Sequence, residues 1–145
     1  MEASRVLTVS GTIEGIRLAA EGFDAFAKAH GLSRHVTWPF QVALDEVVSN
    51  VVHHGTRQGG GEGRIVIELH LQGDQLEMVV DDDGAPFDPL QSPEPDTSQP
   101  VQDRPVGGLG ILIVRRLMDE ITYDRAGGRN RLTMRRTLVV PESVD

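Results

Sequence analysis

Apolar positions recur along the first part of the chain with two different periods. Residues 4–10 (Ser-Arg-Val-Leu-Thr-Val-Ser) alternate between polar and apolar side chains, which predicts a strand. From Ile13 to about His30 the apolar residues recur at helical spacing, and Gly31 then ends this helix. A second helix is predicted from about Pro39 to His54, because proline suits a first helical turn and Gly55 suits the position after the last turn.

Two hairpins are predicted in the rest of the chain. Residues 64–71 and 75–81 form strands that flank the turn Gly73-Asp74. A second strand pair is predicted near 120–125 and 130–139. Strand pairs joined by such short turns are antiparallel.

The segment from Ala85 to Pro105 predicts a long loop. Six of the eight prolines lie in it, namely Pro86, Pro89, Pro93, Pro95, Pro100 and Pro105. Proline lacks an N–H, so the segment cannot be a central strand or a long helix. A helix follows, from the glycines at 107–110 to about Asp119. We therefore expect an α+β fold, a two-layer sandwich whose mixed, mostly antiparallel sheet carries its helices on one face.

Composition places the chain among soluble globular domains. Its 145 residues suit a single domain, 1–145, and no apolar run is long enough for a transmembrane helix. We expect a cytoplasmic protein, since there is no cysteine and no signal-peptide pattern. The net charge of −8 argues against nucleic-acid binding. One basic cluster exists, and we interpret it as a solvated strand face: Arg129, Arg131, Arg135 and Arg136.

The second helix carries three polar residues at intervals of four, Glu46, Asn50 and His54. This spacing makes one slanted stripe beside many valines. The stripe could simply face solvent. Alternatively, the Asn50 carbonyl could bind magnesium beside phosphates, and Glu46 could accept a proton from a hydroxyl. His53 and His54 are adjacent and point to different faces, which disfavours a histidine metal site.

Three consecutive carboxylates, Asp81, Asp82 and Asp83, follow an apolar strand and precede Gly84. Like charges in a row repel, so we expect at least one to have a partner. The run could be a solvated acidic turn, and its spacing does not match a calcium-binding EF-hand. A carboxylate at a strand end could also accept a hydrogen bond from the amino group of adenine, with Gly84 allowing a flat base to approach.

A glycine cluster, Gly107-Gly108-Leu109-Gly110, opens the third predicted helix. Glycines at a helix start leave N–H groups free to face an anion, and the helix dipole favours phosphate. A flexible hinge with a helix cap is the alternative. The cluster matches neither a Walker loop nor a dinucleotide-binding fingerprint.

Taken in order, these features resemble the GHKL (Bergerat-fold) ATPase superfamily, and within it the anti-sigma-factor serine kinases. Residues 46–55 look like the N box of that family and 82–89 like its first glycine box. Residues 108–111 with 114–120 look like the second glycine box, and 130–134 resemble the closing strand. The resemblance spans roughly residues 5–140.

The resemblance implies a set of site residues. Glu46 is the expected catalytic base, and Arg104 is the nearest candidate for an arginine that senses the γ-phosphate. Asn50 is the expected magnesium ligand, and residues 88–106 the expected ATP lid. The nucleotide-binding set implied by the family is Asn50, His54, Asp82, Gly84, Phe87, Gly107, Gly108, Leu109, Gly110 and Thr133, with Asp82 and Thr133 near the adenine and Gly108 and Gly110 near the phosphates.

The resemblance also implies a function and partners. A free-standing domain of this size is similar to the partner-switching kinases, which use ATP and Mg²⁺ to phosphorylate a STAS-domain antagonist on Ser or Thr. In another state these kinases bind a sigma factor or a different target. Homodimers in this family commonly use the first strand and first helix. The alternative is a non-catalytic, ATP-dependent binding switch, and retention of Glu46 favours the kinase. No nucleic-acid or membrane partner is expected.

Overall fold

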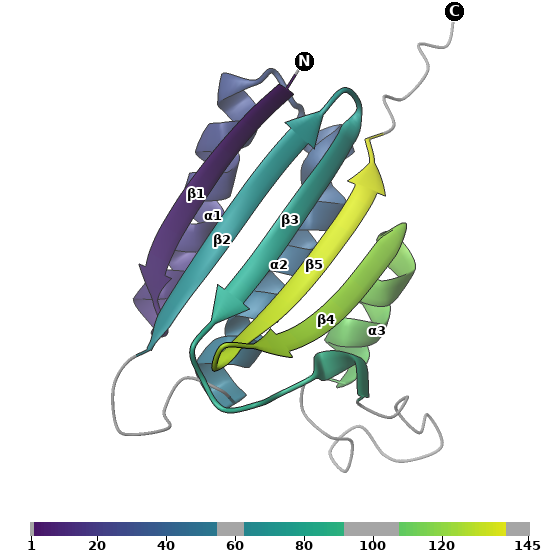
Figure 1. Cartoon of the computed structure of the whole chain (residues 1–145). Helices are drawn as coiled ribbons and strands as arrows, with labels where there is room; N and C mark the ends of the chain where they lie inside the picture. Colours follow the sequence, from purple (N-terminus) through teal and green to yellow (C-terminus); the bar gives the residue numbers. More distant parts are fainter. Residues whose placement is uncertain (1, 55–62, 92–107, 139–145) are drawn as a thin grey trace, which may run out of the picture.

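One antiparallel sheet forms the framework of the protein. The computed structural model describes residues 2–54, 63–91 and 108–138. In these parts the strand order is β1-β2-β3-β5-β4 and every pairing is antiparallel (Figure 1). The strands are β1 (Glu2–Ser10), β2 (Arg64–Gln72), β3 (Gln75–Asp82), β4 (Glu120–Ala126) and β5 (Arg129–Thr137). The expected α+β class is confirmed.

The helices cover one face of this sheet (Figure 1). They are α1 (Ile13–Ala29), α2 (Arg34–His54) and α3 (Gly108–Leu117), with a short 3₁₀ turn η1 (Pro89–Gln91) after β3. Their apolar stripes meet the inward side chains of the strands in one core. Large, fully buried members of this core include Phe23, Phe26, Phe40, Leu44, Ile65, Ile67, Leu69, Met78 and Met134. Burial of such side chains stabilises each by roughly 1.5–3 kcal/mol.

The helix α2 begins earlier than the sequence predicts. It starts at Arg34, so Pro39 lies inside the helix rather than in its first turn. Proline removes one backbone hydrogen bond there. The apolar stripe nevertheless continues through this position, since Val36, Phe40 and Leu44 are all buried at intervals of four. Tertiary packing of this stripe therefore outweighs the local cost of Pro39.

Both predicted hairpins are present, and their turns use the glycines. Gly73 has φ of 61°, and Gly127 and Gly128 have φ of 60° and 75°. Residues with a side chain rarely adopt this left-handed conformation, so glycine suits these tight turns. The third helix ends at Leu117, slightly before the predicted end near Asp119.

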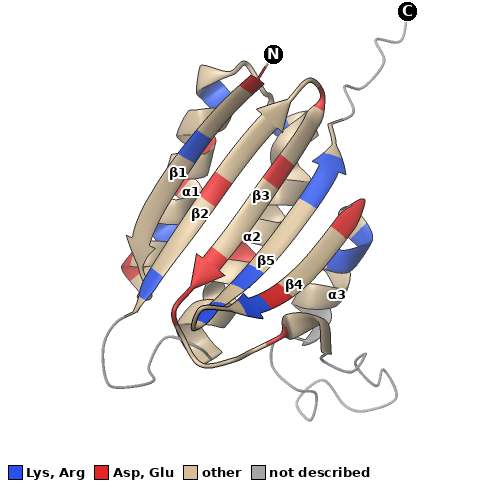
Figure 2. Cartoon of the chain, viewed as in Figure 1, with Lys and Arg blue, Asp and Glu red and all other residues tan. Residues whose placement is uncertain are grey.

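The other face of the sheet carries a ladder of charges instead of helices (Figure 2). Arg131 on β5 pairs with Glu68 at 2.9 Å and with Asp81 at 3.4 Å. Arg135 pairs with Glu77 at 2.5 Å and with Glu120 at 2.9 Å. Three members of the basic cluster are thus matched by carboxylates of neighbouring strands, whereas Arg136 lies on the helix-covered face and donates to the Leu117 carbonyl. The interpretation as a solvated strand face therefore holds for Arg129, Arg131 and Arg135 but is wrong for Arg136. Partly exposed pairs of this kind contribute little each to stability.

Some predicted features lie outside the described residues. These are Gly55, Arg104, Gly107 and residues 92–106 of the expected lid. In the parts that are described, no helix is long and apolar enough to cross a membrane.

Two glycines of α1 give a matched test of its packing on β1. A Cβ added at Gly15 would lie 1.8 Å from the carbonyl oxygen of Ser10, whereas one at Gly22 would meet the flexible end of Leu7 at 2.7 Å. We expect Gly15→Ala to lower the free energy of unfolding by about 2 kcal/mol or more, because backbone cannot move aside cheaply. Gly22→Ala should cost much less, since Leu7 can change rotamer and alanine favours the helix by about 1 kcal/mol.

Urea denaturation of both variants measures the difference. Equal destabilisation by the two substitutions would contradict the close approach of α1 to the backbone at the end of β1.

Candidate functional site

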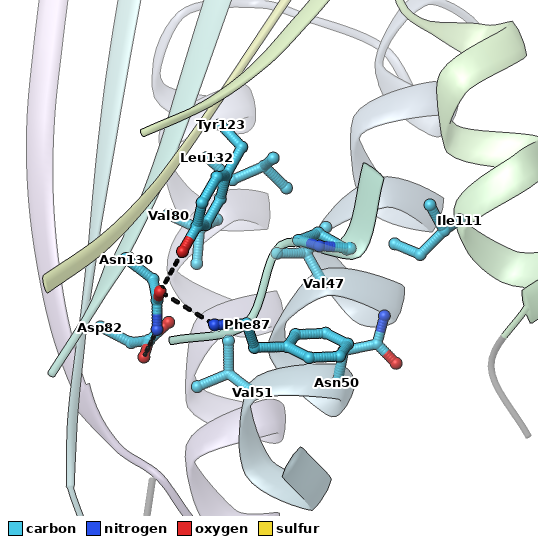
Figure 3. A pocket seen from close by; sticks show the side chains of 11 residues that line it. Val47, Asn50, Val51, Val80, Asp82, Phe87, Ile111, Tyr123, Asn130 and Leu132 are labelled. Carbon is cyan, nitrogen blue, oxygen red and sulfur yellow. Dashed lines mark hydrogen bonds between the residues drawn. The ribbon is translucent and has the colours of Figure 1, made fainter. Parts of the chain in front are cut away.

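A small cavity, open to solvent on one side, lies between α2, the start of α3 and the strands β3, β4 and β5. Figure 3 shows its lining, which is apolar except at a few points. Val47 and Val51 contribute from α2, and Ile111 from α3. The polar groups are Asn50, Asp82, Tyr123 and Asn130. A mostly apolar cavity with a few polar groups is typical of a small-molecule site.

Asp82 is the buried carboxylate of this cavity. It ends β3 on the side that faces the helices and is only 5% exposed. Its Oδ1 accepts hydrogen bonds from the Gly84 N–H at 2.9 Å and from Asn130 Nδ2 at 3.0 Å. Burial raises the pKa of Asp82 above its ordinary value, although these two hydrogen bonds act in the opposite direction. Among the described residues, no hydrogen bond reaches its other oxygen, Oδ2.

The two neighbouring carboxylates have partners outside the cavity. Asp81 faces the open side of the sheet, where it pairs with Arg129 and Arg131. Asp83 accepts a hydrogen bond from the Arg64 N–H at 3.0 Å. The expectation that at least one of the three has a partner is confirmed, and only Asp82 turns toward the cavity.

Asn130 on β5 is a site residue that the sequence analysis did not single out. Its side chain is 5% exposed and lies opposite Asp82 in the β3–β5 register. It donates to Asp82 Oδ1 and to the Ala85 carbonyl at 2.8 Å. It accepts from the Phe87 N–H at 3.2 Å and from the Tyr123 hydroxyl at 2.5 Å. The sequence gives no direct signal for it, because its place beside the end of β3 depends on the β3–β5 register.

Thr133 lies on the opposite face from Asp82. It pairs with Val79 in β3 and with Thr122 in β4, on the side without helices. Side chains alternate between the faces of a strand, and Thr133 is an odd number of residues from Asn130. The expected place of Thr133 near the ligand is therefore corrected: Asn130 occupies that position, and we do not retain Thr133 in the site.

The loop after β3 is fastened at both ends. The Gly84 carbonyl accepts a hydrogen bond from Arg125 Nη1 at 2.8 Å. Further along, the Phe87 ring stacks on His54 at the end of α2, with centroids 5.0 Å apart and an angle of 15°. The loop therefore links the β4–β5 hairpin to α2 and closes one side of the cavity.

The polar stripe of α2 faces this loop and α3. Asn50 is 9% exposed, lines the cavity and makes no hydrogen bond with the other side chains drawn in Figure 3. Glu46 lies one turn earlier, half-buried against α3. Burial raises the pKa of Glu46, and the neighbouring Asp45 adds to this shift. The alternative that this stripe faces solvent is therefore wrong for Asn50, which is buried, and for Glu46, which is half-buried. His54 is exposed.

Gly110 makes the position of Glu46 possible. A Cβ at Gly110 would lie 1.9 Å from the carboxyl carbon of Glu46, so a side chain there would displace this carboxylate from its present position. Gly108 and Leu109 form the first turn of α3, at the helix end whose N–H groups and dipole favour an anion. Glu46, Asn50 and the start of α3 thus come together.

The donor set limits the kind of metal ion. Among the described residues, no three His, Cys, Asp or Glu side chains come together as a metal cluster. A cation bound at Asn50 would therefore need further oxygen ligands from the bound molecule, as Mg²⁺ obtains from phosphates. A buried carboxylate acceptor, an apolar slot and a helix N-terminus together suit a flat, amine-bearing ligand that carries phosphate.

The raised pKa of Asp82 gives a stability prediction. The folded state holds the proton of Asp82 more tightly than the unfolded chain, whose carboxyl titrates near 3.8. The contribution of this group to stability is therefore present at low pH and is lost as the pH rises through the folded-state pKa. We expect Asp82→Asn to raise the free energy of unfolding at pH 7 by about 1 kcal/mol, because the amide keeps an acceptor for Gly84 and Asn130 without a buried charge.

Urea denaturation at pH 7 and at about pH 4 measures this effect, and the gain should shrink at the lower pH. A variant that is less stable than the native protein at pH 7 would show that burial does not penalise the Asp82 carboxylate.

Comparisons with known proteins identify the family of this chain. The family model described as "Histidine kinase-like ATPase domain" matches residues 9–136. The chain is 36% identical over 92 residues to the serine-protein kinase RsbW of Halalkalibacterium halodurans, covering 61% of this chain and 55% of that protein. It is 27% identical over 113 residues to RsbW of Listeria innocua (74% of this chain, 71% of that protein). It is 28% identical over 102 residues to the serine/threonine-protein kinase BtrW of Bordetella bronchiseptica (70% and 71%).

A solved structure shares the fold. The crystal structure of the RsbU and RsbW domains of a Mycobacterium tuberculosis protein matches with a TM-score of 0.69 at 20% identity, covering 96% of this chain and 33% of that one. The match thus spans about half of the first relative and a third of the solved chain. Since its family model extends over residues 9–136, the chain belongs to the histidine kinase-like ATPase domain family.

Proposed function

We propose that this protein is an ATP- and Mg²⁺-dependent serine/threonine protein kinase of the partner-switching type. The observation that carries the proposal is the position of Glu46, whose carboxylate is held against α3 at Gly110, one helical turn from Asn50. A binding module has no chemical need for a proton acceptor at this point. The similarity to a serine-protein kinase and a serine/threonine-protein kinase supports the same reaction.

The chemistry of the cavity lining supports a place for the adenine end of ATP. Oδ2 of Asp82 faces no donor among the described residues and can accept a hydrogen bond from an exocyclic amine. Val47, Val51 and Leu132 supply apolar walls for a flat base. Phe87, which stacks on His54, lines the same space. Gly108 and Gly110 at the start of α3 would then face the phosphates.

Asn50 fits magnesium because a neutral oxygen ligand suits a cation that already has phosphate ligands. The bound ion would supply charge neutralisation on the transferred group. Arg104 and Gly107, which lie outside the described residues, remain proposed contacts for the phosphates.

Glu46 is the proposed base. A serine hydroxyl of the partner gives its proton to the Glu46 carboxylate as the hydroxyl oxygen bonds to the γ-phosphorus, and the bond to the bridging oxygen breaks to release ADP. The raised pKa of Glu46 brings its basicity closer to that required near neutral pH. Gly110 leaves space for the Glu46 carboxylate at this position.

The proposed phosphoryl acceptor is a STAS-domain antagonist, and the competing partner is a sigma factor or another regulated target. The names RsbW and BtrW of relatives support membership of such a system. We also propose a homodimer through β1 and α1. β1 is an edge strand, and the exposed apolar residues Val6, Ile13 and Leu18 lie on these two elements. Sedimentation equilibrium tests this, and a monomer at all concentrations would contradict it.

The role of Glu46 predicts a specific loss of phosphoryl transfer. Incubation with radiolabelled ATP and a STAS-domain protein encoded nearby should label a serine or threonine of that protein. We expect Glu46→Gln to lower the transfer rate by roughly 10²–10⁴-fold, because it removes the proton acceptor, and to leave ATP affinity within a few-fold of the native value. Asp45→Asn changes an adjacent, exposed carboxylate and should retain most of the rate.

The outcomes separate two functions. Transfer that survives in Glu46→Gln would remove Glu46 from the chemistry. No transfer by the native protein, combined with ATP-dependent complex formation, would show a binding switch instead of a kinase.

Asn50 predicts a dependence on magnesium. Asn50→Ala should weaken ATP binding in the presence of Mg²⁺ by roughly tenfold or more, since the substitution removes the only proposed protein ligand of the ion. Ser49→Ala alters the preceding residue of the same helix and should leave affinity unchanged. Calorimetric titration with and without Mg²⁺ measures both, and equal affinity of Asn50→Ala and native protein would reject the assignment.

A further inference from the structure

We propose that Asn130 is a positioning residue for the base subsite. It shapes the loop 84–87 and turns Asp82 so that one carboxylate oxygen faces the cavity as an acceptor. The proposal rests on the proposed function, because it concerns how the site holds a purine nucleotide.

The orientation of the Asn130 amide follows from its partners. The Phe87 N–H can only donate, so it contacts Oδ1 of Asn130. The Ala85 carbonyl can only accept, so it contacts Nδ2. With Asp82 and Tyr123 as the other partners, both donors of the amide and both lone pairs of its oxygen are used (Figure 3). A side chain of the same shape with different donors and acceptors cannot satisfy all four partners.

This orientation determines what Asp82 presents to the cavity. Asn130 and the Gly84 N–H both donate to Oδ1, which uses the lone pairs of that atom. Oδ2 remains, and an ionised carboxylate oxygen can only accept. A purine with an amino group at position 6 meets this requirement, whereas a 6-oxo purine places an oxygen against an oxygen.

The β4–β5 hairpin supports the arrangement from behind. Tyr123 on β4 donates its hydroxyl to Asn130, and burial raises the pKa of this phenol, which keeps the proton in place. Arg125 on the same strand holds the Gly84 carbonyl at 2.8 Å. Arg125 and Asn130 therefore hold the loop through side-chain hydrogen bonds to its backbone, and Tyr123 supports Asn130.

The first test replaces the donor of Asn130 by an acceptor. Asn130→Asp puts an oxygen near Asp82 Oδ1 and the Ala85 carbonyl, so the arrangement survives only while this pair of carboxyls keeps a proton. ATP affinity should therefore be present at low pH and fall by up to roughly tenfold per pH unit once the pH exceeds the pKa of the pair. The native protein should show no such fall between about pH 6 and pH 8.5.

The second test reverses the polarity of the subsite through Asp82→Asn. The donors Asn130 Nδ2 and Gly84 N–H should keep the carbonyl oxygen of the new amide at the Oδ1 position, and its NH₂ then faces the cavity. ITP carries a 6-oxo group where ATP carries the amine. We expect the ratio of the ITP to the ATP dissociation constant to fall by about tenfold or more relative to the native protein.

Controls separate positioning from a general structural role. Thr133→Val lies on the other face of the sheet and should leave both affinities unchanged. Tyr123→Phe removes one donor to Asn130 but leaves the Phe87 N–H, so it should cost only a few-fold in affinity and keep the ratio. Thermal unfolding of each variant, followed by circular dichroism, confirms that binding is measured on folded protein.

Two results would overturn the proposal: an Asn130→Asp variant whose ATP affinity follows the pH profile of the native protein, or an Asp82→Asn variant that keeps the native preference for ATP. If Asn130→Asp does not fold, the ITP-to-ATP ratio of Asp82→Asn decides alone. If the native protein does not bind ATP, the proposed function itself is contradicted. If the native protein binds ATP but the variants behave like it, only the role of Asn130 is contradicted.

Discussion

The sheet is covered by helices on one face only, and this constraint decides which residues can form the site. Along a strand, successive side chains alternate between the core and the open face. At the end of β3, Asp81 therefore joins the charge ladder while Asp82 enters the cavity. On β5 the same alternation sends Arg131 outward and Asn130 inward. The antiparallel register then sets the two inward polar residues side by side.

Burial of the Asp82 carboxylate lowers the stability of the folded state, and the surrounding groups reduce this loss. Burial raises the pKa of Asp82, which means that the charged form is less stable here than in water. Donation from Asn130 and Gly84 recovers part of this energy but does not use Oδ2. Glu46 is in a similar state, half-buried and without a cation beside it among the described residues. Two carboxyls kept at a cost to stability beside one cavity are typical of a functional site rather than of a core.

Sequence periodicity was sufficient for the framework because local signals and packing agree there. The helix of residues 13–30, both hairpins and their glycine turns appear as predicted. The predicted start of α2 was wrong because it relied on Pro39, a local signal for a first helical turn. Burial of the stripe Val36, Phe40 and Leu44 outweighs this signal. Within the site, spacing along one helix placed Glu46 and Asn50 on a common face.

The missed parts of the site depend on contacts between distant segments. Asn130 contacts residues more than 40 positions earlier in the chain, at Asp82, Ala85 and Phe87. Its role follows only once the register of β3 and β5 is known. Thr133 was placed by resemblance, and a shift of three residues along a strand moves a side chain to the other face. The fit of Glu46 to Gly110 similarly needs the packing of α2 on α3.

The contact between Glu46 and Gly110 also connects the two ends of the proposed chemistry. Gly110 lies in the first turn of α3, where phosphate would bind, and its missing side chain gives the carboxylate its place. The pKa of Glu46 is raised chiefly by burial, and part of that burial comes from α3. Any movement of the start of α3 therefore changes both the anion-binding end of the helix and the basicity of Glu46. A ligand that fixes this turn also fixes the proposed base, so binding and proton transfer depend on the same few backbone atoms.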